Sequence, residues 1–273
     1  MEKGNLPGIA GASLMRKIID AHIHLDWYNE KDQSTILNKL DEAGVESLVC
    51  VSSDVESAEA VLTLSRKDSR VKPAVGYHPE QALPSETELR RLLDLIDKYQ
   101  DKIVAIGEVG LPYYRRKENP DLELDAYVEL LEKFVRKAAE LDVPIVLHAI
   151  YEDAPLVCDL LEKHGVRRAH FHWFKGDAGT LKRMNDAGFF ISVTPDCLYE
   201  EEIQELIKTY PLKQMMVETD GPWPFEGPFH GKRTHPKMIH QSIQHIAKLK
   251  QLDLNKVYKQ LYQNTVEFYD IRK

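Results

Sequence analysis

The chain has 273 residues, of which 43% are hydrophobic and 29% charged, and it carries a formal net charge of −8 at pH 7. This composition is that of an ordinary globular protein with room for one large domain or two small ones. No apolar run approaches the roughly 18 residues of a membrane span, and the acidic balance disfavours broad electrostatic attraction to duplex nucleic acid.

The N-terminal segment and the cysteines bear on processing and on the cellular compartment. Residues 1–14 are Gly-rich and unpatterned, so we expect a leader there, left by cloning or disordered, followed by one domain over residues 15–273. The three cysteines, Cys50, Cys158 and Cys197, are odd in number and scattered. We therefore expect reduced thiols and a cytoplasmic location, with no disulfide framework.

Short apolar runs alternate with longer amphipathic stretches along the chain. Eight runs have the length and composition of buried strands, at residues 18–25, 47–53, 72–79, 103–111, 144–150, 169–174, 189–195 and 215–222. Helix-like segments lie at residues 86–99, 122–141, 153–164, 177–187, 200–210, 236–250 and 255–269. Eight strands alternating with helices predict a single-domain (β/α)8 TIM barrel, with an open doubly wound sheet as the alternative.

Unexpected polar residues stand near the ends of six of the predicted strands. They are, in chain order, His22, His24, His78, Glu108, His148, His170, His172, Glu218 and Asp220. In a parallel barrel the carboxyl ends of all strands open on one face, where these side chains would converge. Imidazoles and carboxylates in this number suit two divalent ions, with zinc, manganese and magnesium all compatible with the ligand types.

Glu108 lies midway round the predicted barrel and is the natural carboxylate to bridge two ions. Alternation along a strand leaves two choices open, because His170 shares a strand face with His172 and Glu218 shares one with Asp220. Any one of these histidines, taken alone, is also compatible with a hydrogen-bonded polar residue at a strand end. The prediction of a metal site therefore depends on the whole set.

Seven stretches of the chain resemble motifs of the TatD-related deoxyribonucleases, which are metal-dependent hydrolases with an amidohydrolase-like barrel. They are "DAHIHLD" (20–26), "VGYHPE" (75–80), "AIGEVGL" (105–111), "VPIVLHA" (143–149), "HWFKGD" (172–177), "VETDGP" (217–222) and "GKRTHP" (231–236), in the family's order and spacing. The resemblance implies a first ion held by His22, His24, Glu108 and Asp220. It implies a second ion that Glu108 shares with His148 and His172, and it favours these residues over His170 and Glu218.

The resemblance also bears on substrate binding. It places His78 beside the site, in contact with the substrate phosphate; a hydrogen-bonded loop residue before Pro79 is the alternative. Cations that could grip phosphate oxygens follow two predicted strands: Lys232 and Arg233, and also Arg115, Arg116 and Lys117, for which a solvated surface is the alternative. The family pattern Gly-Leu-Asp-Tyr-Tyr here has Pro112 in place of the carboxylate. This departure puts a simple transfer of substrate preference in doubt.

Taken together, these residues predict a divalent-metal-dependent hydrolase, foremost a deoxyribonuclease. A hydroxide held between two ions would attack the phosphodiester, with Glu108 bridging the ions and Asp220 orienting the water and accepting its proton. The expected partner is DNA offered as short or single-stranded ends, with bases against loop aromatics such as Tyr113, Tyr114, Trp173, Trp223, Phe225 and Phe229. We expect no membrane or protein partner. The alternatives are an amidohydrolase-type enzyme acting on a C–N or ester bond of a small molecule and a non-catalytic metal-binding protein.

Overall fold

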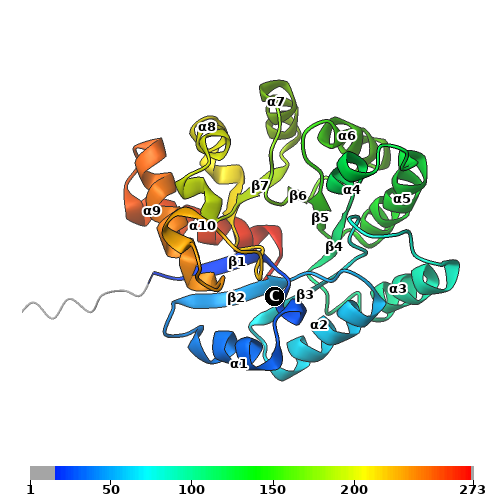
Figure 1. The fold of residues 1–273 in the computed structure, drawn as a ribbon, viewed down its shortest axis with the longest axis horizontal. Helices are drawn as coiled ribbons and strands as arrows, with labels where there is room; N and C mark the ends of the chain where they lie inside the picture. Colours follow the sequence, from blue (N-terminus) through cyan, green and yellow to red (C-terminus); the bar gives the residue numbers. More distant parts are fainter. Residues whose placement is uncertain (1–15, 272–273) are drawn as a thin grey trace, which may run out of the picture.

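Eight parallel strands, arranged in chain order, form the centre of the computed structural model, which describes residues 16–271 (Figure 1). They are β1 (Ile18–Ile23), β2 (Val45–Cys50), β3 (Val71–Val75), β4 (Ala105–Gly110), β5 (Ile145–His148), β6 (Ala169–Phe171), β7 (Phe190–Val193) and β8 (Met215–Val217). The expected leader over residues 1–14 lies outside the described residues.

The sheet curls round until its last strand returns to its first. Just past β8, the amide of Asp220 donates to the carbonyl of His22 at 2.9 Å, and the amide of His24 donates to the carbonyl of Gly221 at 2.8 Å. These backbone hydrogen bonds join the two edges of the sheet into a nearly closed barrel. The predicted TIM barrel is therefore confirmed, and the alternative of an open doubly wound sheet is wrong.

Helices surround the barrel on its outside (Figure 1). They are α1 (Glu30–Lys39), α2 (Val55–Lys67), α3 (Glu86–Lys98), α4 (Tyr113–Glu118), α5 (Leu124–Leu141), α6 (Asp153–His164), α7 (Ala178–Ala187), α8 (Glu201–Thr209), α9 (Ile239–Lys250) and α10 (Leu254–Phe268). The seven segments expected to be helical correspond to α3 and to α5 through α10. Helices α1, α2 and the short α4 were not expected from the sequence.

Local sequence explains where these helices begin and which face they bury. Ser85 caps α3 with a reciprocal capping box, in which its side chain accepts from the Glu88 amide and the Glu88 carboxylate accepts from the Ser85 amide. Helix α5 buries a stripe at helical spacing that includes Leu131, Phe134 and Ala138, and this helix lies against β4 and α6. Such amphipathic helices cover the outer faces of the strands and hold the barrel in register.

The half of the barrel toward the amino ends of the strands is filled with apolar side chains. Inward-facing residues such as Ile19, Val49 and Met216 form one cluster, and Phe268 and Tyr269 from the end of α10 pack against it. Because these side chains plug this end, the interior of the barrel is reached from the carboxyl ends of the strands. The fold therefore offers a single interior face on which a polar site can form.

Candidate metal centre

Six polar residues of the predicted ligand set come together at the carboxyl ends of five strands. His22 lies in β1, Glu108 in β4 and His148 at the end of β5. His24, His172 and Asp220 lie just past β1, β6 and β8, because those strands end earlier than expected. The backbone leaves the strand geometry at Asp220, with φ of 49°, a left-handed conformation that aspartate tolerates better than most residues.

Glu108 is fully buried at the centre of this group, and its two carboxylate oxygens face different partners. Oε2 lies 3.1 Å from Nε2 of His22 and 3.1 Å from Nε2 of His24. Oε1 lies 2.8 Å from Nε2 of His172 and 3.2 Å from Nδ1 of His148. The carboxylate thus divides the imidazoles into two sets, which is the arrangement expected of a group shared between two ions.

Asp220 joins the first of these two sets. Its Oδ1 lies 3.3 Å from Nε2 of His22 and 3.5 Å from Nε2 of His24. His22, His24 and Glu108 offer three atoms close enough together to hold one ion, and His78, Glu108 and His148 offer another such group. The donor types, imidazole nitrogen and carboxylate oxygen, suit zinc and manganese as well as magnesium.

The hydrogen bonding within this cluster is incomplete. Both oxygens of Glu108, Oδ1 of Asp220 and Nε2 of His22 are buried and have no hydrogen-bond partner within the described part of the chain. Buried polar atoms are almost always satisfied, because leaving them unpaired costs about 1–3 kcal/mol each. A divalent ion bound to these same atoms would satisfy them, so the residues present fit the group.

The electrostatics of the cluster favour cations. Burial by itself disfavours a charged imidazole, yet the carboxylates of Glu108 and Asp220 raise the pKa of His22 to about 9. Burial likewise opposes ionisation of Glu108, and the imidazoles of His172, His78 and His22 nevertheless hold its pKa well below the usual range. The carboxylates therefore remain ionised at neutral pH and attract positive charge, whether protons on the imidazoles or metal ions.

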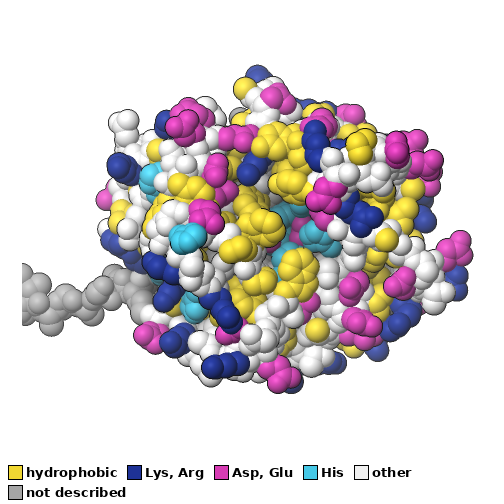
Figure 2. All heavy atoms as spheres, viewed as in Figure 1, with side chains coloured by type: hydrophobic (Ala, Val, Ile, Leu, Met, Phe, Trp, Pro, Cys, Tyr) yellow, Lys and Arg dark blue, Asp and Glu magenta, His cyan; other side chains and the backbone are white. Residues whose placement is uncertain are grey.

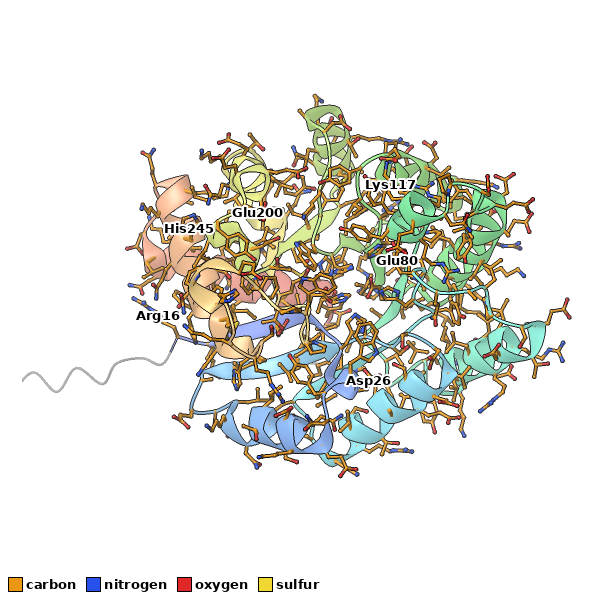
Figure 3. All side chains as sticks on the ribbon, in the orientation of Figure 1. Arg16, Asp26, Glu80, Lys117, Glu200 and His245 are labelled. Carbon is orange, nitrogen blue, oxygen red and sulfur yellow. The ribbon has the colours of Figure 1, made fainter. Side chains whose placement is uncertain are left out.

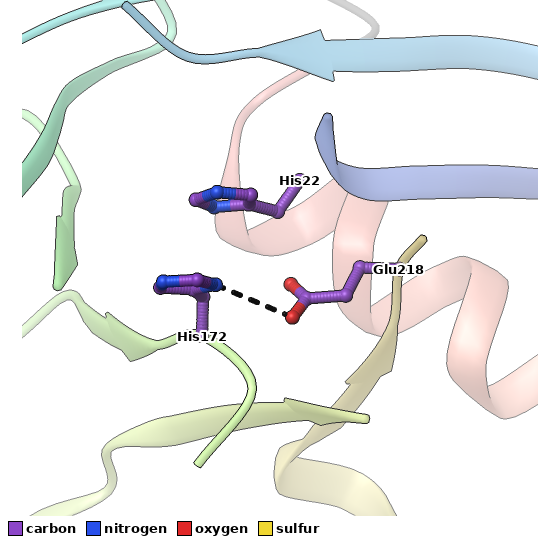
Figure 4. Close-up of side chains that lie close together, drawn as sticks. All are labelled: His22, His172 and Glu218. Carbon is purple, nitrogen blue, oxygen red and sulfur yellow. Dashed lines mark ion pairs between the residues drawn. The ribbon is translucent and has the colours of Figure 1, made fainter. Parts of the chain in front are cut away.

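Glu218 stands behind the cluster and orients one of its members. Its Oε1 lies 3.4 Å from Nδ1 of His172, whose ring stacks on that of His22 at 3.8 Å (Figure 4). These three residues are also close enough to hold an ion. However, Glu218 already accepts hydrogen bonds from the Trp173 amide at 2.8 Å and the Ser192 hydroxyl at 2.5 Å. We therefore interpret Glu218 as the carboxylate that fixes the His172 ring.

His170 points away from the cluster, into the plugged end of the barrel. Its Nδ1 is 2.6 Å from the Tyr269 hydroxyl and its Nε2 is 2.6 Å from the Ser192 hydroxyl. Both ring nitrogens are therefore occupied by hydrogen bonds within the protein. The choice that alternation along β6 left open, between His170 and His172, is resolved in the structure in favour of His172 as the residue beside Glu108.

Glu80, in the loop after β3, is a functional candidate that the sequence reasoning missed (Figure 3). Its Oε1 lies 3.0 Å from Nε2 of His148, on the side of the ring opposite Glu108. The same carboxylate accepts the amides of Tyr114 at 2.8 Å and Arg115 at 2.9 Å, at the start of α4. Glu80 closes the quoted stretch "VGYHPE", so its place beside a histidine motif was the only available signal.

His78 lies at the edge of the centre. Its Nε2 is 3.4 Å from Oε1 of Glu108, and its Nδ1 accepts the amide of Glu80 at 3.1 Å. Burial lowers the pKa of His78 to about 4, so the ring is neutral at pH 7. His78 is thus hydrogen-bonded within its loop and also faces the shared carboxylate, and contact with a substrate phosphate stays a prediction.

Four of the five predicted phosphate-binding cations have partners within the protein. Arg233 forms an ion pair with Asp32 of α1, and Nζ of Lys232 donates to the carbonyl of Pro228 at 2.7 Å. In α4, the side chains of Arg116 and Lys117 pair with acids of or just before α6, at 2.5 Å to Asp153 and 3.4 Å to Glu152. Two of the three cations of α4 are therefore ion-paired to acids of the same protein.

Buried imidazoles gathered round a shared carboxylate, at the carboxyl ends of an eight-stranded barrel, define the class of barrel-fold metal-dependent hydrolases. The comparison with known families agrees. The chain belongs to the TatD related DNase family, whose model matches residues 19–270. The family expected from the sequence is thus confirmed, and the protein is a metal-dependent hydrolase.

Individual relatives span nearly the whole chain. An uncharacterized metal-dependent hydrolase of Haemophilus influenzae is 38% identical over 253 residues, covering 92% of this chain and 99% of the relative. The human deoxyribonuclease TATDN3 is 29% identical over 261 residues, covering 92% of this chain and 94% of its own. The crystal structure of YJJV, a TATD homolog of Escherichia coli, matches with a TM-score of 0.84 at 23% identity, covering 94% and 99% of the two chains. This last likeness shows that the fold is shared.

Proposed function

We propose that the protein is a deoxyribonuclease that hydrolyses phosphodiester bonds with two divalent ions. His22, His24, Glu108 and Asp220 would hold the first ion, and Glu108, His148 and His172 the second. The observation that carries this proposal is the position of Glu108, whose two buried oxygens lie 3.1 Å from His22 and 2.8 Å from His172. A carboxylate serving only one ion would have no reason to present its second oxygen to a separate set of imidazoles.

The residues of the centre divide the chemistry among them. Bound divalent ions supply Lewis acidity, which makes a water molecule acidic enough to attack at neutral pH and offsets negative charge on the phosphate. Asp220 is ionised, because His22 lowers its pKa against the opposing effect of burial, so its carboxylate can orient that water and take its proton. His78, neutral and close to Glu108, would donate a hydrogen bond to a phosphate oxygen.

DNA is the proposed substrate because a relative with almost complete coverage is named a deoxyribonuclease. The net charge of −8 disfavours an extended duplex, so we propose short or single-stranded ends as the form that enters the barrel. Lys232 and Arg233 are exposed on the loop after β8 and would help to neutralise the strand. The ion pair of Arg233 with Asp32 limits its part in this.

The proposed cytoplasmic location is supported by the cysteines. Cys50, Cys158 and Cys197 are buried and unpaired, which supports a reducing, cytoplasmic location. Within residues 16–271, no helix combines the length and the apolar character needed to cross a membrane.

Hydrolysis of an end-labelled single-stranded oligonucleotide tests the proposal. The protein would be stripped with a chelator and supplied in turn with magnesium, manganese or zinc. Glu108→Ala runs alongside as the control for contaminating nuclease, and Leu252→Ala, at an exposed position, is the control for substitution in general. We expect metal-dependent cleavage that Glu108→Ala abolishes and Leu252→Ala retains. Cleavage by Glu108→Ala at the wild-type rate would refute the bridging role. Metal binding without cleavage would favour a small-molecule amidohydrolase instead.

A further inference from the structure

Three large aromatic side chains at the mouth of the barrel are far more exposed than is usual for residues of their size. Trp27 is 49% exposed, Tyr114 49% and Trp223 56%. Across residues 16–271, five large hydrophobic side chains are exposed, and these three are the aromatic ones. They come from the segments that follow β1, β4 and β8, with Tyr114 in α4, so separate parts of the chain bring them to the same face.

Two of these rings lie next to candidate ligands of the metal centre. The indole of Trp27 stacks on the imidazole of His24, with ring centroids 3.9 Å apart and planes inclined by 12°. The Tyr114 ring lies 6.1 Å from that of His148. Figure 2 shows a hollow over the barrel with histidine at its floor and hydrophobic side chains around it. When the reacting bond of a substrate lies at the histidines on the floor of this hollow, the groups next to that bond would contact these aromatic rings.

The third exposed ring, Trp223, lies on the side of β6. Trp223 meets Trp173 edge to face, with ring centroids 5.8 Å apart, and Trp173 directly follows His172 in the chain. Trp173 is itself held in place, since its Nε1 donates to Asp196 at 2.6 Å. Trp173 thus supports Trp223 and leaves it as the exposed partner of the pair.

The other aromatic residues considered from the sequence have structural partners. Phe225 and Phe229 are buried and pack against Met238 beneath the loop after β8. Tyr113 packs against Tyr151 and lies under Nζ of Lys117. The structure therefore narrows the six candidates to Tyr114 and Trp223, and it adds Trp27.

We propose that Trp27, Tyr114 and Trp223 form a stacking platform for unpaired bases next to the bond that is cut. The inference rests on the proposed function and adds to it the feature of the substrate that is recognised. Every base has an aromatic face, but in a duplex that face is covered by its neighbours, so only unpaired nucleotides can use such a platform. Arg233, Lys232 and Arg116 have partners within the protein, so stacking would supply a part of the binding that these cations do not.

The chain is well suited to a direct test, because its three tryptophans, Trp27, Trp173 and Trp223, all lie at the mouth. Intrinsic tryptophan fluorescence therefore reports on this region alone. Metal-stripped protein would be titrated with an oligothymidylate of about ten nucleotides and with a strand of equal length built from abasic residues. We expect the oligothymidylate to quench the fluorescence at concentrations on the order of tenfold lower than the abasic strand requires.

Kinetics with the loaded enzyme then separate stacking from support of the metal centre. Trp27→Ala and Tyr114→Ala should raise KM for oligothymidylate on the order of tenfold, with cleavage of the abasic strand unchanged, and Leu252→Ala should alter neither. Equal quenching by the two strands would overturn the inference. So would an equal loss on both strands in Trp27→Ala, since that residue would then act only through His24. If oligothymidylate quenches more strongly than the abasic strand but the enzyme cleaves neither strand with any added ion, the result would contradict the proposed nuclease activity and still support the platform.

Discussion

Glu80 is the residue whose removal most directly tests the proposed second ion site, the one that uses Glu108, His148 and His172. Its carboxylate sits 3.0 Å from Nε2 of His148, while Nδ1 of the same ring faces Glu108 at 3.2 Å. When Nε2–H donates to Glu80, Nδ1 is left as a lone pair directed at the centre, which is the form that binds a metal. Substitution by alanine would free both the tautomer and the orientation of this ring.

The size of the effect can be worked out from these contacts. Losing an acceptor that fixes a histidine ligand typically costs 10- to 100-fold in metal affinity, or about 1.4–2.8 kcal/mol. Glu80 also accepts the amides of Tyr114 and Arg115, and Pro112 gives α4 no side-chain cap of its own. We therefore expect a further loss of about 1–2 kcal/mol in the stability of the metal-free protein from the uncapped amides.

Calorimetric titration of the stripped protein with zinc measures the affinity of each site, and denaturant unfolding of the stripped protein measures its stability. In Glu80→Ala the site that uses His148 should weaken, while the site that uses His22 and His24 keeps its wild-type affinity. Glu152→Ala is a matched control, because this acid pairs with Lys117 on the same side of the mouth without touching a proposed ligand. Wild-type affinity at both sites in Glu80→Ala would refute the assigned role.

Three further predictions concern stability. Burial raises the pKa of Asp196 from 3.8 to about 6, so the folded state loses up to about 3 kcal/mol as the pH rises through that window; Asp196→Asn should remove this loss in denaturant titrations at pH 4 and pH 7. A methyl group at Gly110 would overlap the carbonyl oxygen of His148, so Gly110→Ala should cost about 1–3 kcal/mol in thermal unfolding of the metal-free protein. Chelation should lower Tm by about 5–10 °C for each ion present at 100 times its Kd, with no shift in Glu108→Ala.

The fold could be predicted because its signals are local and repeated. Each strand is a short apolar run and each covering helix has a buried stripe, as α5 shows with Leu131 and Ala138. The candidate ligands could also be predicted, because a parallel barrel brings the carboxyl ends of all its strands to one face. What alternation along a strand could not decide was which of two residues on one face reaches the centre. His170 is excluded by contacts with Ser192 and Tyr269, residues 22 and 99 positions further along the chain.

Features that depend on how loops cross one another were out of reach of the sequence. Glu80 is held beside His148 by amides of α4 that lie 34 and 35 residues further along the chain. In the sequence Arg116 has no visible acidic partner. In the structure its partner is Asp153, which is 37 residues further along the chain and lies 2.5 Å from it. Trp27 was overlooked although it stands three positions after His24, because a single aromatic residue in a loop has no periodicity to mark it.

The composition of the centre itself argues for bound cations over a structural role. A buried carboxylate surrounded by imidazoles is an expensive way to hold a fold together, because an apolar replacement of similar volume is often as stable or more so. The structure nevertheless places Glu108 at 0% exposure with both oxygens lacking hydrogen bonds, at the one end of the barrel that Phe268 and Tyr269 do not plug. A divalent ion on each side of Glu108 would offset the cost of burying that carboxylate and would supply the catalytic centre. The loops around it would then determine the substrate.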